Sequence, residues 1–384
     1  MTVIEPPLST PVMRPARLGD YDEIRRLGLA FSLDVPPEED WRRLWLDNPL
    51  RDTFGDDLPL GWVLETAKGE MVGTMGTVLV PYLCRREPLV SAVSRAWFVA
   101  TPYRTFALQL MDEYINQPRV DLCINSAVSV PALEAFRQFC EPVPLGQWDC
   151  MSYWITGHQG FAYRRLLESG VPLPRLLSYT AGATSWVKSA MRGRRWPKIS
   201  NVNIELTDRF DNRFDVFWNE LARQSPHSLL ADRSSRTLAW HFGAPMRHGA
   251  LWVFTASRGG RLMAYCVLTR QDNAFRLPAP PHEDRQGIKC ARLADYQCLD
   301  PESDALPDLL GAALERCSRD GVYVLENLGR GVPKMRFLDD RAPFCERLSN
   351  WKFYYTAREP QLRAALREPR MWDPSAYDGD ASFE

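Results

Sequence analysis

The sequence of 384 residues lacks the cysteine and histidine spacings that bind metals. Its nine cysteines are scattered, and the closest pair, Cys290 and Cys298, excludes a CxxC zinc or redox motif. An odd cysteine count without a signal peptide argues against a disulfide framework. The five histidines form no HExxH motif, so we expect no metal. GxSxG, GxxxxGK and GxGxxG motifs are also missing, which leaves most common enzyme classes unsupported.

The sequence also has little net charge and no long apolar run. A formal net charge of −1 gives no global attraction to nucleic acid, so we expect no DNA partner. No window approaches the roughly 18 apolar residues of a membrane span, and the N-terminus does not resemble a signal peptide. We therefore expect a cytoplasmic protein. With 45% hydrophobic and 25% charged residues, the chain has the composition and length of two folded domains.

An internal repeat is the clearest feature that is present. Residues 62–79 read WVLETAKGEMVGTMGTVL and residues 252–268 read WVFTASRGGRLMAYCVL, and the two segments align from their first residues without a gap. Each predicts a β-hairpin that turns at Gly69 or Gly259.

Four further matches follow the same order in each copy. A tryptophan shortly before a proline precedes the hairpin, a strand ending near a proline follows it, and an apolar strand and a closing aromatic strand come later. The matching segments are 45–49 and 240–245, 95–99 and 295–299, 120–125 and 322–327, and 148–154 and 351–355. Five matches in register indicate a duplicated domain. We expect Trp62 to be equivalent to Trp252, and Val99 to Leu299.

The order of elements in each copy predicts a mixed α/β fold: helix, hairpin, strand, helix, strand, helix, strand. We place copy one at residues 12–157 and copy two at 200–357. Residues 158–199 form a basic helical linker between them, and residues 358–384 are a C-terminal tail.

Copy one resembles the acyl-CoA N-acyltransferase (GNAT) superfamily over its whole length. Residues 13–24 look like the family's first strand and helix, and residues 99–111 occupy the place of its pyrophosphate loop. Tandem GNAT folds occur in protein N-myristoyltransferases, mycothiol synthases and Fem peptidyltransferases, and the resemblance is to this two-copy layout. It implies two tandem GNAT-like domains, each a mixed, mostly antiparallel sheet flanked by helices.

The resemblance implies an acyl-CoA site in copy one, for acetyl-CoA or another acyl-CoA. In such a loop, backbone amides at a strand-to-helix turn face the pyrophosphate. The family's glycine positions read Thr105, Ala107 and Gln109 here, and the positions of its usual Asn and proton-donating Tyr read Ser129 and Phe136. The residues expected to bind the cofactor are Trp97, Phe98, Val99, Tyr103, Arg104, Thr105, Phe106 and Ala107.

Two carboxylates of copy two are candidates for the general base. Asp295 falls where GNAT enzymes often hold one, whereas copy one has Arg95 there, and Glu326 is the second candidate. The alternative for Asp295 is an ion pair with Arg292 or a bond to the backbone. Copy two has acidic residues, 302–304, in place of the loop, so we expect no CoA in copy two.

Asn125 and Asn327 end equivalent strands, at the point where the family's strands separate to admit the thioester, and we expect them to bind substrate. The sequence thus predicts transfer of an acyl group to an amine or hydroxyl of a small-molecule, lipid-linked or sugar-linked acceptor between the copies. Two alternatives stay open: an aminoacyl-tRNA-dependent Fem-type transferase, and a catalytically silent acyl-CoA-binding protein.

The linker combines apolar residues with a basic end at Arg192, Arg194, Arg195 and Lys198. We interpret it as an interdomain helix whose apolar stripe packs on a domain. The alternative is peripheral membrane contact through residues 176–198.

Overall fold

The structure is a computed structural model that describes residues 10–383 with internal gaps. The residues outside the description are 1–9, 32–34, 127, 129, 145–148, 155–161, 163–165, 167–168, 194–200, 271–288, 301–304, 323, 330–343, 348–352 and 384. The acidic segment 302–304 and Ser129, both considered above, therefore lie outside the described residues.

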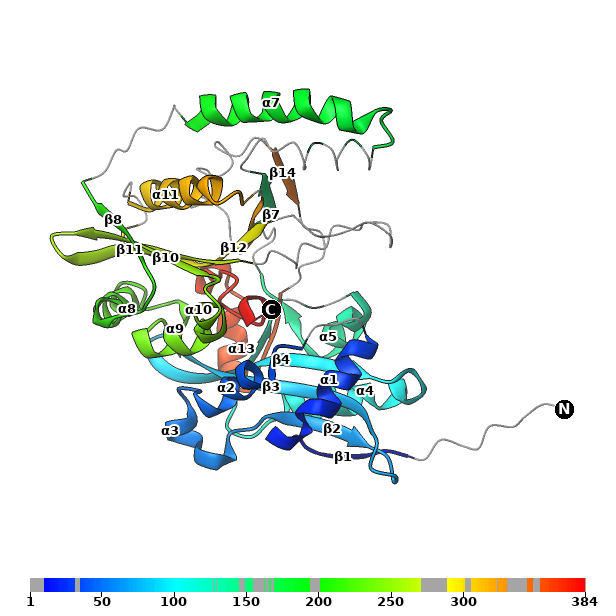
Figure 1. The fold of residues 1–384 in the computed structure, drawn as a ribbon. Helices are drawn as coiled ribbons and strands as arrows, with labels where there is room; N and C mark the ends of the chain where they lie inside the picture. The colour runs from blue at the N-terminus through cyan, green and yellow to red at the C-terminus, as the bar shows by residue number, and fades with distance from the viewer. Residues whose placement is uncertain are drawn as a thin grey trace.

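The described strands form two mixed sheets, seen in Figure 1 in the lower and upper halves of the molecule. The first sheet has the order β1-β2-β3-β4-β5-β15-β6, and β9 pairs with β3. Only the pairing of β4 with β5 is parallel. Its strands are β1 (Val12–Pro15), β2 (Gly61–Glu65), β3 (Met71–Cys84), β4 (Glu87–Val99), β5 (Leu122–Asn125), β6 (Glu141–Pro142), β9 (Leu229–Ala231) and β15 (Tyr354–Ala357).

The second sheet repeats this order from its other end as β8-β10-β11-β12-β13-β7-β14. Again one central pairing, β12 with β13, is parallel. Its strands are β7 (Asp149–Trp154), β8 (Asn203–Thr207), β10 (Leu251–Arg258), β11 (Arg261–Arg270), β12 (Cys290–Cys298), β13 (Val324–Gly329) and β14 (Phe344–Arg347). The expected fold, two mixed α/β sheets in tandem, is confirmed.

One of the two predicted equivalences between the copies fits the structure, and the other is displaced by one residue. Trp62 and Trp252 are each the second residue of the first hairpin strand. Val99 ends β4 opposite Gly73, whereas β12 ends at Cys298, one residue before Leu299. The backbone amides of Ala100 and Leu299 donate to the carbonyls of Val72 and Met263, so Leu299 corresponds to Ala100 and not to Val99. Both hairpins turn through glycines with positive φ, +79° at Gly69 and +56° at Gly259, a conformation that favours glycine.

The closing strands are exchanged between the two sheets, which the sequence did not predict. Strand β15, from the end of copy two, pairs with β5 of copy one, and β7, from the end of copy one, pairs with β13 of copy two. An aromatic alternating segment specifies a strand but not its neighbour, because partner choice depends on which sheet edge is within reach. The boundaries 12–157 and 200–357 therefore describe the two copies in the sequence, and as boundaries of structural domains they stay a prediction.

Helices cover the sheets because each has an apolar stripe. In α8 (Asn212–Gln224) the buried residues are Phe214, Phe217, Trp218 and Leu221, the spacing of one helix face. The carboxylate of Asp211 caps this helix by accepting from the amide of Arg213. The other α-helices used below are α1 (Tyr21–Ala30), α2 (Glu38–Leu46), α4 (Ala107–Ile115), α5 (Leu133–Phe139), α9 (Ser235–His241), α10 (Gly243–Arg247), α11 (Ala305–Arg319) and α13 (Pro360–Leu366).

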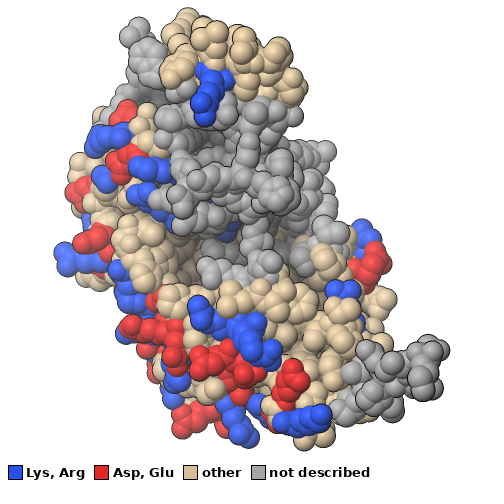
Figure 2. Space-filling view, turned by 45° about the vertical axis from the view of Figure 1, so that its right-hand side comes forward, with Lys and Arg blue, Asp and Glu red and all other residues tan. Residues whose placement is uncertain are grey.

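Helix α7 (Pro174–Gly193), in the linker, lies at the top of the molecule in Figure 1. Figure 2 shows that the described residues at the top of the molecule are mostly uncharged, whereas acidic and basic side chains are interspersed over its lower part. The exposed apolar residues of α7 are Leu176, Leu177, Tyr179, Val187 and Met191. The expected packing of an apolar stripe on a domain is therefore wrong for these residues. No helix in the described part of the chain is long and apolar enough to cross a membrane.

The C-terminal segment, residues 372–382, is buried and reaches the middle of the molecule (Figure 1). Asp380 accepts hydrogen bonds from the amide and the hydroxyl of Ser126, directly after β5. Gly379 has φ +148°, and a Cβ there would lie 2.4 Å from Ser126 Oγ, so glycine is required for this approach. Arg292, in β12 of copy two, donates a hydrogen bond to the carbonyl of Ala381 at 2.6 Å. The tail is thus attached to both sheets.

Candidate functional site

Strands β4 and β5 of copy one separate soon after they meet. They pair only from Ser91 to Ala92, and then the side chain of Asn125, not its backbone, bonds to Ser94: Oδ1 accepts from the amide at 3.0 Å and from Oγ at 2.6 Å. A β-bulge follows, because the register of β4 against β3 shifts and Ala96 has φ +50°. Such a bulge bends the strand and changes the direction of its side chains and amides.

Two buried nitrogen donors lie beside this separation. The indole Nε1 of Trp97 and the amide Nδ2 of Asn125 have no hydrogen-bond partner among the described residues. Leaving a buried donor unpaired costs about 1–3 kcal/mol, so such groups in a folded protein call for an explanation. Both can donate to an oxygen that enters between the strands. The predicted substrate-binding residue Asn125 is therefore at the point of separation, fully buried.

The predicted cofactor loop is a turn of 3₁₀ helix, Thr101–Phe106, which leads from β4 into α4. Amides in such a turn donate to carbonyls three residues earlier, as Tyr103 does to Ala100 and Ala107 to Arg104. These two amides are therefore already used within the turn. Arg104 and Thr105 are exposed, whereas Tyr103, Phe106 and Ala107 are half-buried.

The strand residues before the loop belong to the core. Phe98 stacks on Phe31 at 5.8 Å between ring centroids, and Val99 is buried in the core of the first sheet. Trp97 meets Phe136 edge to face at 5.9 Å. Phe136, at the position of the family's Tyr, is itself buried, so this position supplies packing and no proton.

A cavity of about 180 Å³ lies between the two copies. Copy one supplies α2 and the part of β4 before the bulge, and copy two supplies α9, α10 and the end of β11. The tail closes it with Ser382 and Phe383. The side chains that line it are Pro36, Asp40, Arg43, Leu44, Arg95, Trp240, His241, Ala244, Pro245, Arg247, Thr269, Arg270, Ser382 and Phe383.

The ionisable lining of this cavity is mostly basic. Asp40, the one acidic residue among the described lining residues, accepts a hydrogen bond from Arg247 at 2.5 Å, and its other carboxylate oxygen lies 2.6 Å from His248 Nε2. Although burial raises the pKa of Asp40, hydrogen bonds from His248 and Arg247 lower it overall below 3.8. The guanidinium of Arg95 lies over the ring of Phe383, 5.7 Å from its centroid.

His241 is the buried imidazole of the cavity. Its Nε2 is 2.5 Å from Ser382 Oγ, and its Nδ1 is buried without a hydrogen-bond partner among the described residues. Burial, together with the positive charges of Arg233 and Arg95, holds its pKa well below 6.5. The ring is therefore neutral at pH 7.

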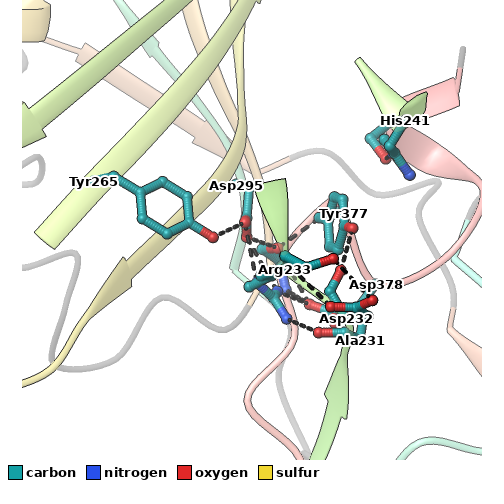
Figure 3. Close-up of polar contacts among 11 residues, drawn as sticks. Ala231, Asp232, Arg233, His241, Tyr265, Asp295, Tyr377 and Asp378 are labelled. Atoms are coloured by element: carbon teal, nitrogen blue, oxygen red, sulfur yellow. Dashed lines mark hydrogen bonds and ion pairs between the residues drawn. The ribbon is translucent and has the colours of Figure 1, made fainter. Parts of the chain in front are cut away.

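The base candidate Asp295 lies at the centre of a buried polar network (Figure 3). Its two carboxylate oxygens accept from Arg233 Nε and Nη2 at 3.0 and 3.1 Å, from Tyr265 at 2.6 Å and from Ser375 at 2.8 Å. Arg233, 1% exposed, also donates to Asp378 at 2.9 Å. The alternative that paired Asp295 with Arg292 therefore named the wrong arginine, because the ion pair of Asp295 is with Arg233.

The second base candidate, Glu326, accepts two 3.2 Å bonds from Arg292 and is 8% exposed. Asn327, the last β13 residue paired with β12, is fully buried. Neither Asp295 nor Glu326 lines the cavity. Their proposed role as bases stays a prediction, and both carboxylates are engaged by an arginine.

The sequence predicted an acceptor site between the copies but singled out few of the residues that line this cavity, among them Trp240 in the tryptophan–proline match and Arg95 beside the strand end of copy one. They come from segments about 200 positions apart whose only local signal is the paired tryptophan–proline match. Of the two tryptophans, Trp45 is buried and donates to Thr77, whereas Trp240 donates to Leu44 and lines the cavity.

Two sheets in the same strand order, each with one parallel pairing followed by a bulge, define a tandem GNAT-type fold. Known structures agree. Saccharomyces cerevisiae N-myristoyltransferase with bound myristoyl-CoA superposes with a TM-score of 0.57 at 12% identity, over 93% of this chain and 81% of that one. A GCN5-related N-acetyltransferase from Anabaena variabilis gives 0.53 at 10% identity, over 90% and 72%.

A conserved protein of unknown function from Enterococcus faecalis V583 gives 0.53 at 11% identity, over 91% of this chain and 73% of that one. No family model matches the chain, and no curated protein matches it by sequence. At these identities the likeness establishes the fold, and the activity has to be argued from the site.

Proposed function

We propose that this protein transfers an acyl group from an acyl-CoA thioester to an amine or hydroxyl of an acceptor in the cavity between the copies. The observation that carries the proposal is the separation of β4 and β5 beside two unpaired buried donors, Trp97 Nε1 and Asn125 Nδ2. A thioester carbonyl between the strands would accept from such donors, and the developing oxyanion would accept more strongly. Structural neighbours that are named acyltransferases support the same class.

In this proposal the acyl-CoA lies along copy one, against residues 97–107. Arg104 is the exposed cation of the loop and would contact phosphate. Phe136 cannot protonate the departing thiolate, so the thiolate leaves without a protein acid or takes a proton from water. A thiol of pKa about 8.5 is a fair leaving group.

The acceptor must lose a proton as it attacks. Asp295 and Glu326 remain candidates from the sequence, but each is engaged by an arginine. A hydroxyl or neutral amine could instead release its proton to water in the cavity. The acceptor's identity beyond amine or hydroxyl, a cytoplasmic location and membrane contact through residues 176–198 stay predictions.

A thermal-shift panel with CoA, acetyl-CoA and a long-chain acyl-CoA tests the proposal. A ligand that binds only the folded state stabilises it by about 2.7 kcal/mol at a hundredfold excess over Kd, so Tm should rise. Arg104→Glu should abolish the rise. The matched control is Arg258→Glu, at an exposed arginine that ends β10 of copy two, and it should keep the rise.

No shift with any acyl-CoA would overturn the proposal. A shift with aminoacyl-tRNA in its place would favour the Fem-type transferase, whose donor needs no pyrophosphate loop. A shift without turnover on any amine or hydroxyl acceptor would favour the catalytically silent acyl-CoA-binding protein.

A further inference from the structure

Helix α7 presents large apolar side chains to solvent and buries small residues. Of its described residues, Ser178 and Gly182 are buried and Ala181 is half-buried. The large apolar side chains at its start and along its length are 41 to 71% exposed, namely Leu173, Leu176, Leu177, Tyr179, Val187 and Met191. A helix on a protein surface normally turns its apolar side toward the core. The described part of the molecule therefore leaves the apolar side of α7 uncovered.

Five of these residues form one stripe along the helix. At about 3.6 residues per turn, positions three, four or eleven apart lie on the same side of a helix. Such spacings relate the residues that we name the apolar stripe, Leu173, Leu176, Leu177, Val187 and Met191. The two buried residues of the helix lie on the opposite side. The apolar stripe and the side that faces the protein are therefore separate faces of one helix.

The first residue of the apolar stripe has a strained backbone. Leu173 has φ +55°, a left-handed conformation that is disfavoured for a residue with a Cβ atom. Its carbonyl accepts hydrogen bonds from the amides of Leu176 and Leu177, so the strained residue starts the helix. Strain of this kind is concentrated at functional positions. The side chain of Leu173 is itself exposed, so it adds to the apolar stripe and not to the core.

The charge of α7 indicates the kind of partner. The sequence of this 20-residue helix contains Arg175, Lys188 and Arg192 and no aspartate or glutamate, although the whole chain has 47 basic and 48 acidic residues. Apolar side chains combined with basic residues suit the boundary between the acyl chains and the headgroups of anionic lipids. Tyr179, exposed next to the stripe, belongs to the aromatic residues that are enriched at this boundary.

The same charge argues against a second copy of the chain as the partner, because two α7 helices packed together would bring like charges close to one another. The position of the helix suits a flat surface. In Figure 1, α7 lies across the top of the molecule, and no other labelled element lies beyond it in that view. A surface can therefore approach the helix along its length.

We propose that α7 docks on the surface of a lipid bilayer that contains anionic lipids, with its apolar stripe in the boundary between headgroups and acyl chains. The helix lies in the plane of the surface and contacts one leaflet. This inference goes beyond the proposed acyl transfer and does not depend on it.

Flotation of the full chain with vesicles tests the inference. We expect the protein to float with vesicles of phosphatidylcholine and phosphatidylserine. Vesicles of phosphatidylcholine alone should bind it at least about tenfold less tightly, because each basic residue near an anionic surface contributes a factor of about five. High salt should reduce the difference. No flotation, or equal binding to the two kinds of vesicle, would overturn the inference.

Variants test whether the apolar stripe makes the contact. Leu176→Ser combined with Val187→Ser should weaken vesicle binding by about tenfold or more, because two apolar side chains no longer leave water. The matched control is Leu29→Ser combined with Val216→Ser, at an exposed leucine of α1 and an exposed valine of α8, and it should leave binding unchanged. All four side chains are exposed, so both double variants should keep the Tm of the parent protein. Equal losses of binding in the two double variants would overturn the inference.

A single substitution gives a second measure at the far end of the stripe. Met191→Glu adds a negative charge at an exposed position of the stripe and should also weaken binding to vesicles with phosphatidylserine. Unchanged binding in this folded variant would overturn the inference.

The mass of the chain in solution, measured by light scattering without vesicles, distinguishes a second copy from a bilayer. A dimer that Leu176→Ser with Val187→Ser converts to a monomer would make the stripe an interface between copies and overturn the inference. The acyl-CoA shift and its loss in Arg104→Glu do not involve α7. Flotation without an acyl-CoA shift would therefore refute the proposed donor site and leave the docking helix supported, and the reverse result would do the opposite.

Discussion

Copies one and two carry opposite charges about one position apart in equivalent strands. Arg95 in copy one and Asp295 in copy two each lie next to the bulge of the fourth strand of their sheet, since both registers shift there. Arg95 lines a solvent-accessible cavity, whereas Asp295 is fully buried among Arg233, Tyr265 and Ser375. Duplication thus produced one half that retains an open site and one half in which the equivalent region became structural.

The C-terminal segment makes this difference possible. Ser375 and Asp378 enter the network of copy two, and Phe383 ends at Arg95 of copy one. The same segment therefore belongs to the buried network around Asp295 in copy two and forms a wall of the cavity beside copy one. Three tests can break or sharpen this comparison.

The largest effect is expected at Arg233. Arg233→Met would leave Asp295 and Asp378 buried without their cation, and removing one partner of a buried pair typically costs about 3–5 kcal/mol. Arg104→Met in copy one, at an exposed loop residue, should stay within about 0.5 kcal/mol. Urea unfolding followed by tryptophan fluorescence measures both. Similar small losses in the two variants would show that the network in copy two is not structural.

A smaller effect is expected at Asp295. Asp295→Asn keeps an acceptor for Tyr265 or Ser375 but weakens the pairing with Arg233, so we expect a loss of about 1–3 kcal/mol in unfolding free energy. CoA release per folded molecule, with any acceptor that proves active, should remain unchanged. If Asp295 is the base, release should instead fall by about 10²–10⁴-fold at an unchanged Tm. Glu326→Gln is measured alongside, and the same kinetic loss there would make it the base.

The smallest effect concerns the pH dependence of stability and His241, a buried residue on the lining of the cavity. Its pKa is held well below 6.5 by burial and by Arg233 and Arg95, whereas the unfolded chain takes up the proton near 6.5. The unfolded state then binds more protons in acid, so His241 should cost up to about 1.4 kcal/mol of stability per pH unit below about pH 6.5. Stability should be independent of this group above that pH.

Urea unfolding at pH 5.5 and 7.5 checks this expectation. His241→Gln should reduce the loss of stability between the two pH values, whereas His227→Gln, at an exposed histidine, should not. An identical pH dependence in the wild type and His241→Gln would mean that the imidazole is not kept neutral by the fold.

Much of the fold was predictable because the signals that define it are local and occur twice. The hairpins with glycine turns at Gly69 and Gly259, the tandem mixed sheets and the equivalence of Trp62 and Trp252 all follow from alternation, turn residues and register. The resemblance of residues 13–24 and 99–111 to the GNAT superfamily pointed to the fold that the known structures share.

The tertiary structure alone decided what lies between the copies. The exchange of β7 and β15, the insertion of residues 372–382 and the pairing of Arg233 with Asp295 join segments that no local pattern connects. The cavity has the same origin, because Arg95 and Arg270 line one space only after the two copies have packed together. Local sequence determines each strand and helix through propensity and periodicity, whereas the partner of a buried charge is decided by which side chains the packed chain brings within hydrogen-bonding distance.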